Sequence, residues 1–214
     1  NGAVNPPADA PIDYVVFDLG GVVLRETDGL RDLAERIGAP SDITAAEFRS
    51  AYYATRLDYD LHSDSELYWT QVALACGASE PRSADIADLT AIDNVGWSHV
   101  DSATMDLIVA LYRAGVALAV LSNAPAAMGD MIRGQSWAGM FQHIVISGEI
   151  GMIKPDLAIY EALLKALDVP APTVAFTDDR ADNVAGAAAA GIRGIPFTGA
   201  DALRQRLQTL GVSI

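Results

Sequence analysis

The chain has 214 residues, of which 51% are hydrophobic and 20% are charged. This composition is typical of a folded globular protein and excludes the polar, charge-rich signature of intrinsic disorder. The formal net charge is −14, and the 14 basic residues are scattered without a basic run, which disfavours nucleic acid or an anionic membrane as a partner. A small phosphorylated molecule remains a possible partner if a few cations or a metal gather in one cleft.

The single cysteine, the apolar runs and the N-terminal segment together indicate in which cellular compartment the protein is expected. Cys76 is the only cysteine, so no intrachain disulfide can form, and we expect a cytoplasmic protein. The longest apolar candidate, Val116 to Ala124, falls short of the roughly 20 residues of a membrane span. Residues 1–11 are proline-rich and lack the basic and apolar regions of a signal peptide, so we interpret them as a tail.

Short apolar runs without strict alternation recur along the chain, which is typical of strands buried on both faces. The runs are Ile12–Leu19, Val116–Asn123, His143–Ser147, Thr173–Asp178 and Ile192–Phe197. Helical patterns precede three of them, at Ser102–Gly115, Lys154–Val169 and Ala181–Gly191. The alternation predicts an α/β fold with a parallel sheet covered on both faces.

The interval 25–99 differs, because it contains helix-like patterns and no convincing buried strand. The clearest patterns are Thr44–Leu57 and Ser63–Gly77. We predict an all-helical cap here, inserted after the first strand, with residues 12–24 and 100–214 forming the α/β core. Thr27 to Leu30 are expected to form the hinge where the cap begins, and hinge movement would admit substrate and exclude water.

Asp18 ends the first apolar run, and Gly20 and Gly21 follow it. A buried strand tolerates an unpaired carboxylate poorly, so Asp18 needs a partner, a metal or water. The glycines allow backbone to approach whatever Asp18 contacts. From the residues alone, Asp18 can be a nucleophile, a metal ligand, both, or a capping residue for the next turn.

The segment TDDRADN, Thr177 to Asn183, places two acids after a buried strand. Adjacent carboxylates repel each other, and their ionised forms usually need a nearby cation. With Asp18 facing Asp178 and Asp179, a magnesium (Mg²⁺) site is the economical explanation. The alternative is that Asp182 or Asn183 caps the following helix and the acid pair is a solvated turn.

Two further segments supply groups for anionic oxygens. Ser122 and Asn123 offer a hydroxyl and an amide at the end of another strand, although this is also ordinary turn chemistry. Lys154 precedes a proline at a helix start, where its ammonium can reach back, although a lone lysine is more often a surface charge. Because ligands of open parallel sheets bind at the carboxyl ends of strands, we expect all these groups in one cleft.

The order of FDLGG, LSN, GMIKPDLAIY and FTDDRADN resembles the four motifs of the haloacid dehalogenase-like hydrolases, over nearly the whole chain. The resemblance implies a three-layer, Rossmann-like, doubly wound core with a helical cap after the first motif. It implies that Asp18 attacks phosphorus and forms an aspartyl-phosphate. Ser122, Asn123 and Lys154 would bind the phosphoryl oxygens, and Lys154 would offset developing charge.

The resemblance also implies the metal ligands. Mg²⁺ would be bound by Asp18, by the backbone carbonyl of Gly20 and by Asp179. Asp178 and Asn183 would support these ligands through water or hydrogen bonds.

Position 20 departs from the family pattern. Most phosphatases of this family carry a second aspartate two residues after the nucleophile, as general acid and base, where this chain has Gly20. Such a group typically contributes about 10²- to 10⁴-fold to the rate. The chain is therefore slow, or another group substitutes, or the leaving group needs little help.

Three functions follow from the resemblance. The first is a Mg²⁺-dependent phosphatase for a small phosphomonoester, similar to glucose-1-phosphate phosphatases, because a sugar 1-phosphate has a relatively acidic leaving group. The second is a metal-independent 2-haloacid dehalogenase, since halide leaves without a proton. The third is a binding or regulatory protein that has lost turnover. We favour the phosphatase, because Asp178 and Asp179 beside Asp18 would repel an anionic haloacid without a cation.

The cap offers cations and aromatic residues but no clear site. Aromatic residues at helical spacing are more often core, so we assign none of them a role. The residues in question are Arg49, Tyr53, Arg56, His62, Trp69 and Trp97. His62 is a conceivable proton donor, although a surface position is expected for it. The sequence leaves the substrate and the oligomeric state open.

Overall fold

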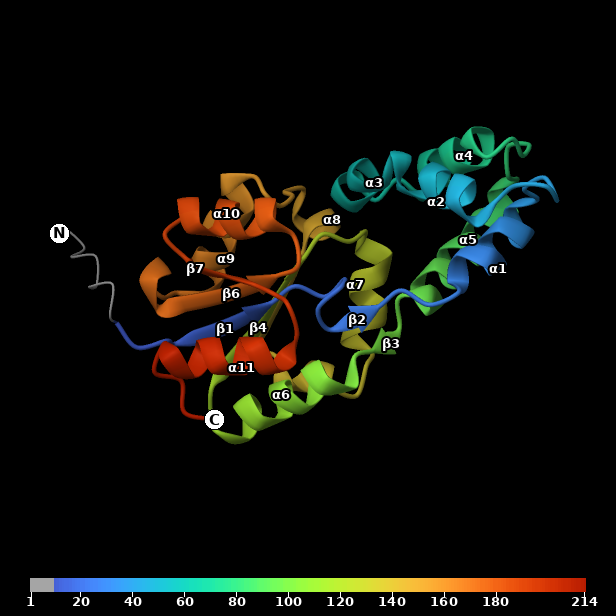
Figure 1. Cartoon of the computed structure of the whole chain (residues 1–214). Coiled ribbons are helices and arrows are strands. Elements are labelled where there is room, and N and C mark those ends of the chain that lie inside the picture. Colours follow the sequence, from blue (N-terminus) through green and yellow to red (C-terminus); the bar gives the residue numbers. More distant parts are fainter. Residues whose placement is uncertain (1–9) are drawn as a thin grey trace.

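The computed structural model describes residues 10–214, and its main sheet has five parallel strands in the order β5-β4-β1-β6-β7 (Figure 1). The strands are β1 (Tyr14–Phe17), β4 (Ala117–Ser122), β5 (His143–Ile146), β6 (Val174–Asp178) and β7 (Arg193–Pro196). They lie within the five predicted runs and are shorter at the ends. The predicted α/β fold with a doubly wound parallel sheet is confirmed.

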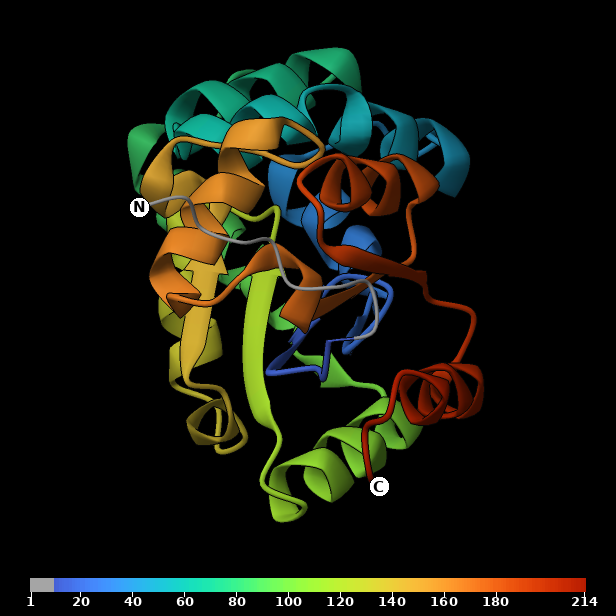
Figure 2. The same ribbon diagram turned by 90° about the vertical axis from the view of Figure 1, so that its left-hand side faces the viewer.

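Helices cover both faces of this sheet (Figures 1 and 2). The core helices are α6 (Ser102–Arg113), α7 (Ala126–Arg133), α8 (Ser147–Ile150), α9 (Leu157–Leu167), α10 (Ala181–Ala189) and α11 (Ala200–Thr209). Val15 and Phe17 of β1 face a hydrophobic cluster formed with α6, α7 and α11, whereas Val16 faces α9 and α10. Successive strand residues point to opposite faces, so one strand is buried from both sides and reads as a continuous apolar run.

A group of five helices lies beside one end of the sheet (Figures 1 and 2). They are α1 (Gly29–Ile37), α2 (Ala45–Ala54), α3 (Arg56–His62), α4 (Ser65–Ala75) and α5 (Ser83–Gly96). They bury their own hydrophobic cluster, separate from the clusters of the sheet. The predicted helix at Thr44–Leu57 is in fact two helices, α2 and α3, which meet at Thr55.

A short antiparallel pair that the sequence pattern did not predict connects this helical group to the core. Strand β2 (Leu24–Arg25) pairs with β3 (His99–Val100), with Leu24 opposite Val100. Each strand straddles an expected boundary between cap and core. The two connections between these parts of the chain are therefore hydrogen-bonded to each other.

The chain's first described residues contact the core. Of the predicted tail, residues 1–9 lie outside the described part of the chain. Ala10 is buried, and its carbonyl accepts a 2.6 Å hydrogen bond from Arg193. Among residues 10–214, no helix is both long and apolar enough to cross a membrane.

Candidate active site

Three strands end side by side where the predicted site residues lie. Phe17 of β1 is in register with Val120 of β4 and with Thr177 of β6. Asp18 and Asp178 therefore lie at one level, whereas β4 continues to Ser122. This register places Asp18 and Asp178 next to each other at the carboxyl edge of the sheet.

Lys154 links these two carboxylates from the loop before α9. Its Nζ donates to Asp18 Oδ1 at 2.8 Å, to Asp178 Oδ2 at 2.6 Å and to the Leu121 carbonyl at 3.0 Å. The lysine side chain is only 1% exposed. All three donors of the ammonium group are thus used inside the protein. Lys154 therefore reaches into the cleft, as the sequence predicted.

Asp178 is held in turn by the start of α10. Asn183 Nδ2 lies 3.1 and 3.0 Å from the two oxygens of Asp178, and the backbone N–H of Arg180 donates to Oδ1 at 2.9 Å. Both carboxylate oxygens are therefore engaged by protein groups. This arrangement fits a residue that orients Lys154, in line with the supporting position predicted for Asp178 and Asn183.

Burial and charge compete in this cluster. Burial raises the pKa of Asp18 to about 6, although Lys154 opposes the shift. Burial alone would lower the pKa of Lys154, but Asp18 and Asp178 outweigh it, so the pKa is raised and the ammonium stays charged. At neutral pH Asp18 is then mostly ionised, as a carboxylate nucleophile must be.

Ser122 and Asn123 end β4 beside this cluster. Ser122 is buried, and its hydroxyl has no hydrogen-bond partner among residues 10–214, so it is available to a ligand. Asn123 is engaged differently: its Nδ2 donates to the Lys154 carbonyl at 3.0 Å, and the Lys154 N–H donates to Oδ1 at 2.9 Å. The Asn123 side chain therefore positions Lys154, and only its backbone is left for the predicted phosphate contact.

The acids satisfy the chemistry of a magnesium site. Asp18, Asp178 and Asp179 each offer a carboxylate oxygen, and these oxygens lie within 4.8 Å of one another. Burial, and next the charge of Asp178, raise the pKa of Asp179. Hard oxygen ligands with excess negative charge suit Mg²⁺. With Asp178 occupied by Lys154, Asp18 and Asp179 are the oxygen donors that fit best.

The glycine pair makes room for Asp179. Gly21 has φ +77°, and a Cβ added there would lie 2.2 Å from Asp179 Oδ2. The Gly21 N–H donates to the Leu24 carbonyl and closes the turn that carries Gly20 past Asp18. A side chain at position 21 would therefore displace the carboxylate. The sequence indicated close backbone approach here but not its partner.

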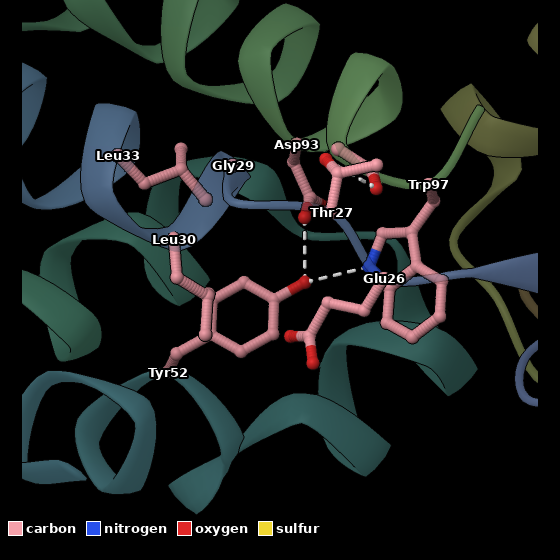
Figure 3. Close-up of a pocket in the computed structure, with 9 residues that line it drawn as sticks. Glu26, Thr27, Gly29, Leu30, Leu33, Tyr52, Asp93 and Trp97 are labelled. Atoms are coloured by element: carbon pink, nitrogen blue, oxygen red, sulfur yellow. Dashed lines mark hydrogen bonds between the residues drawn. The ribbon is translucent and has the colours of Figure 1, made fainter. Parts of the chain in front are cut away.

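An aromatic side chain lies over Gly20, which the sequence did not reveal. A Cβ placed on Gly20 would lie 3.5 Å from Trp97 Cζ3 and 3.9 Å from Cη2. Trp97 directly follows α5, and its Nε1 donates to Tyr52 Oη at 3.1 Å (Figure 3). The indole therefore spans from the helical group to the turn after Asp18.

Tyr52 belongs to a buried polar network inside the helical group. Its hydroxyl donates to Asp93 Oδ1 at 2.5 Å and accepts from Arg56. Arg56 also pairs with Asp93 at 2.9 Å and with Asp60 at 2.8 Å. Aromatic residues at helical spacing were expected to be core, and Tyr52 is buried in the core of the helical group. The network that it joins ends at Trp97 beside Gly20.

The structure also places two other groups of residues that were discussed for the cap, His62 and the predicted hinge. His62 is the last residue of α3, is exposed, and contacts Asp58 at 3.1 Å, so it is the expected surface residue. In the predicted hinge, the Thr27 N–H and hydroxyl both lie 3.1 Å from the Gly96 carbonyl. Hinge movement stays a prediction.

Residues 12–191 match the family model described as a haloacid dehalogenase-like hydrolase. Among curated proteins, the sesquiterpene phosphatase astK of Aspergillus oryzae is 34% identical over 116 residues, which cover 54% of this chain and 59% of that protein. The drimenol cyclase drtB of Aspergillus calidoustus is 38% identical over 71 residues, 33% of this chain. The chain thus spans only 13% of the cyclase and 59% of the phosphatase.

Solved structures share the fold at low identity. A Bacteroides thetaiotaomicron enzyme crystallised with magnesium and inorganic phosphate has a TM-score of 0.66 at 18% identity, covering 88% of this chain and 95% of its own. The L-2-haloacid dehalogenase of Xanthobacter autotrophicus has a TM-score of 0.68 at 18% identity, covering 92% and 83%. The fold alone therefore does not separate phosphate ester hydrolysis from dehalogenation.

Proposed function

Because the chain belongs to the haloacid dehalogenase-like hydrolase family, we propose that it is a Mg²⁺-dependent phosphatase with Asp18 as its nucleophile. The family match confirms the resemblance seen in the four motifs. The observation that carries the proposal is the cluster of Asp18, Asp178 and Asp179 around buried Lys154. Three carboxylates and one ammonium leave a local negative charge, which an anionic substrate enters only with a cation.

The reaction proceeds at the Asp18 carboxylate oxygen that does not accept from Lys154. This oxygen forms a bond to phosphorus while the bond from phosphorus to the alcohol oxygen breaks, and the departing oxygen takes a proton from water, which gives an aspartyl-phosphate and the alcohol. Water then cleaves the aspartyl-phosphate, releases inorganic phosphate and regenerates the carboxylate. The Ser122 hydroxyl binds a phosphoryl oxygen. Lys154, whose three N–H donors are used by Asp18, Asp178 and the Leu121 carbonyl, contributes its positive charge rather than the predicted hydrogen bond to the phosphoryl group. Bound Mg²⁺ supplies positive charge against the phosphoryl group and the acids.

Because position 20 is a glycine, no side chain there can protonate the departing alcohol. A sugar 1-phosphate meets this condition through its relatively acidic anomeric hydroxyl. The relative named as a sesquiterpene phosphatase favours a second class, the monophosphate of a terpenoid alcohol. Both are small phosphomonoesters, and the proposal covers both. The cytoplasmic location expected from the single cysteine stays a prediction.

The test is phosphate release from a panel of sugar phosphates, terpenyl monophosphates, nucleotides and an aryl phosphate. It is run with Mg²⁺ and with chelator, on the wild type and on Asp18→Asn. We expect release that needs the metal and disappears in the variant. Full activity in Asp18→Asn would refute the nucleophile assignment. Halide release from 2-chloropropionate without metal would establish the dehalogenase, and phosphate binding without turnover would establish a binding protein.

A further inference from the structure

The side of the site next to Gly20 is aromatic rather than acidic. Gly20 and Trp97 are both half-buried, and the six-membered ring of the indole is the side-chain group nearest to the missing Cβ of Gly20. A carboxylate at position 20 would project toward this ring and contact a leaving-group oxygen. The ring therefore faces the region where the alcohol part of a phosphate ester lies.

The orientation of the indole is fixed by saturated hydrogen bonding. Burial raises the pKa of Tyr52 well above its usual value, so its hydroxyl keeps its proton. It donates that proton to Asp93 and accepts from Arg56 and from Trp97. One donor and two acceptor positions are thus all occupied. Because the Tyr52 hydroxyl can accept no further hydrogen bond, its hydrogen bond from Trp97 Nε1 fixes the orientation of the indole.

A small pocket and a larger groove lie near Trp97 in the helical group. The small pocket is lined by Leu30, Leu33, Tyr52 and Trp97 together with the polar Glu26, Thr27 and Asp93, and it holds about 10 Å³, no more than one water (Figure 3). A groove of about 550 Å³ between α1 and α2 shares Glu26, Thr27 and Leu30 with that pocket. The groove is amphipathic, since Ala34, Ile43, Ala45, Ala46 and Phe48 line it together with Asp28, Arg31, Thr44 and Arg49. The indole ring beside Gly20 is therefore the apolar surface next to the site.

We propose that Trp97 is the specificity-determining residue of this enzyme and selects phosphomonoesters of hydrocarbon-rich alcohols. The alcohol packs its hydrocarbon against the exposed part of the indole ring beside Gly20. A polyhydroxy alcohol such as a sugar loses hydrogen bonds to water against the indole ring and gains none from the ring. The inference rests on the proposed function, because it concerns the ester that Asp18 attacks.

Steady-state kinetics with two esters test the assignment. Farnesyl monophosphate is the hydrocarbon-rich ester and glucose 1-phosphate the polar one, compared in wild type, Trp97→Ala and Trp97→Phe. We expect wild type to prefer farnesyl monophosphate in kcat/KM. Trp97→Ala should lower kcat/KM for that ester at least 10-fold, mainly through KM, and change glucose 1-phosphate less than 3-fold. Trp97→Phe keeps a ring and should retain most of the preference.

A direct contact measurement guards against a variant that is merely misfolded. Farnesol should change the tryptophan fluorescence of wild type and of Trp137→Phe, the matched control in the core, but not that of Trp97→Phe. Equal losses for both esters in Trp97→Ala, a wild-type preference for glucose 1-phosphate, or an unchanged farnesol signal in Trp97→Phe would each overturn the assignment. If no ester is hydrolysed, or if Asp18→Asn stays active, the proposed function itself fails, which is a different result.

Discussion

Replacing Lys154 by methionine tests whether the buried charges act as one cluster. Methionine keeps most of the aliphatic stem and removes the ammonium between Asp18 and Asp178. At the 4.8 Å limit between their oxygens, two such carboxylates repel by about 3.5 kcal/mol at an effective dielectric constant near 20. Removing one partner of a buried ion pair typically destabilises by about 3–5 kcal/mol. We therefore expect Lys154→Met to lower the free energy of unfolding by about 3–5 kcal/mol at pH 7.

The assay is urea unfolding followed by circular dichroism in chelator, with Lys165→Met as the control. Lys165 is the chain's other lysine and lies exposed on α9, so its substitution should change stability by less than about 0.5 kcal/mol. The loss in Lys154→Met should shrink at pH 4.5, because Asp18, whose pKa is about 6 beside Lys154 and is higher without it, is then protonated and no longer repels Asp178. A loss below about 1 kcal/mol at pH 7 would contradict the reasoning, because two unpaired buried carboxylates cost more than that.

Two further substitutions probe the metal site and the helical group. Gly21→Ala should displace Asp179 and raise the Mg²⁺ concentration needed for half-maximal activity about 10-fold or more, in the range seen for altered support of metal ligands. Gly38→Ala is its control, since Gly38 has the same φ of +77° and nothing within 4 Å, and an equal effect of both would exclude the contact with Asp179. Burial raises the pKa of Asp60 to about 6 despite Arg56, so this residue's contribution to stability is present below pH 4 and lost as pH rises through about 6. The stability advantage of wild type over Asp60→Asn should shrink by about 2–3 kcal/mol between pH 4 and pH 7 in urea unfolding, and a constant difference would show that Asp60 does not titrate in this range.

The sheet and the residues at its edge were predictable because their signals are local. A strand buried on both faces must be apolar along its length, so each run marks its own strand. Parallel strands also deliver whatever follows them to one edge, which is why Asp18, Ser122 and Asp178 were expected together before any contact was known. Lys154 was expected in the same cleft from its place at a helix start, but a lysine before a proline carries no signal of burial, so only the family resemblance gave it a role.

Side-chain direction was not predictable, because it depends on contacts between distant segments. Asn123 was expected at the phosphate, but the loop of Lys154 offers it a matched donor and acceptor that its own sequence neighbourhood does not show. Trp97 and Gly20 are far apart in sequence and meet only because β2 and β3 pair at the base of the helical group. Aromatic residues at helical spacing look the same whether they fill a core or line a site.

The helical group is connected to the site by more than its two connecting segments. Ser147 Oγ donates to the Asp60 carbonyl at 2.6 Å and accepts from the Ala124 N–H at 2.9 Å. A continuous series of hydrogen bonds therefore runs from the loop after Ser122 through Asp60, Arg56 and Tyr52 to Trp97.

The place of a residue in this series of hydrogen bonds determines whether it can be substituted without loss of the buried network. Arg56 is buried between Asp60, Asp93 and Tyr52, so its loss strands buried acids and costs stability. Trp97 ends the series with a single hydrogen bond, and Tyr52 still accepts from Arg56 when the indole is absent. The surface proposed to contact the alcohol can therefore change without dismantling the network that holds it, which is the property expected of a residue that sets specificity beside a fixed catalytic cluster.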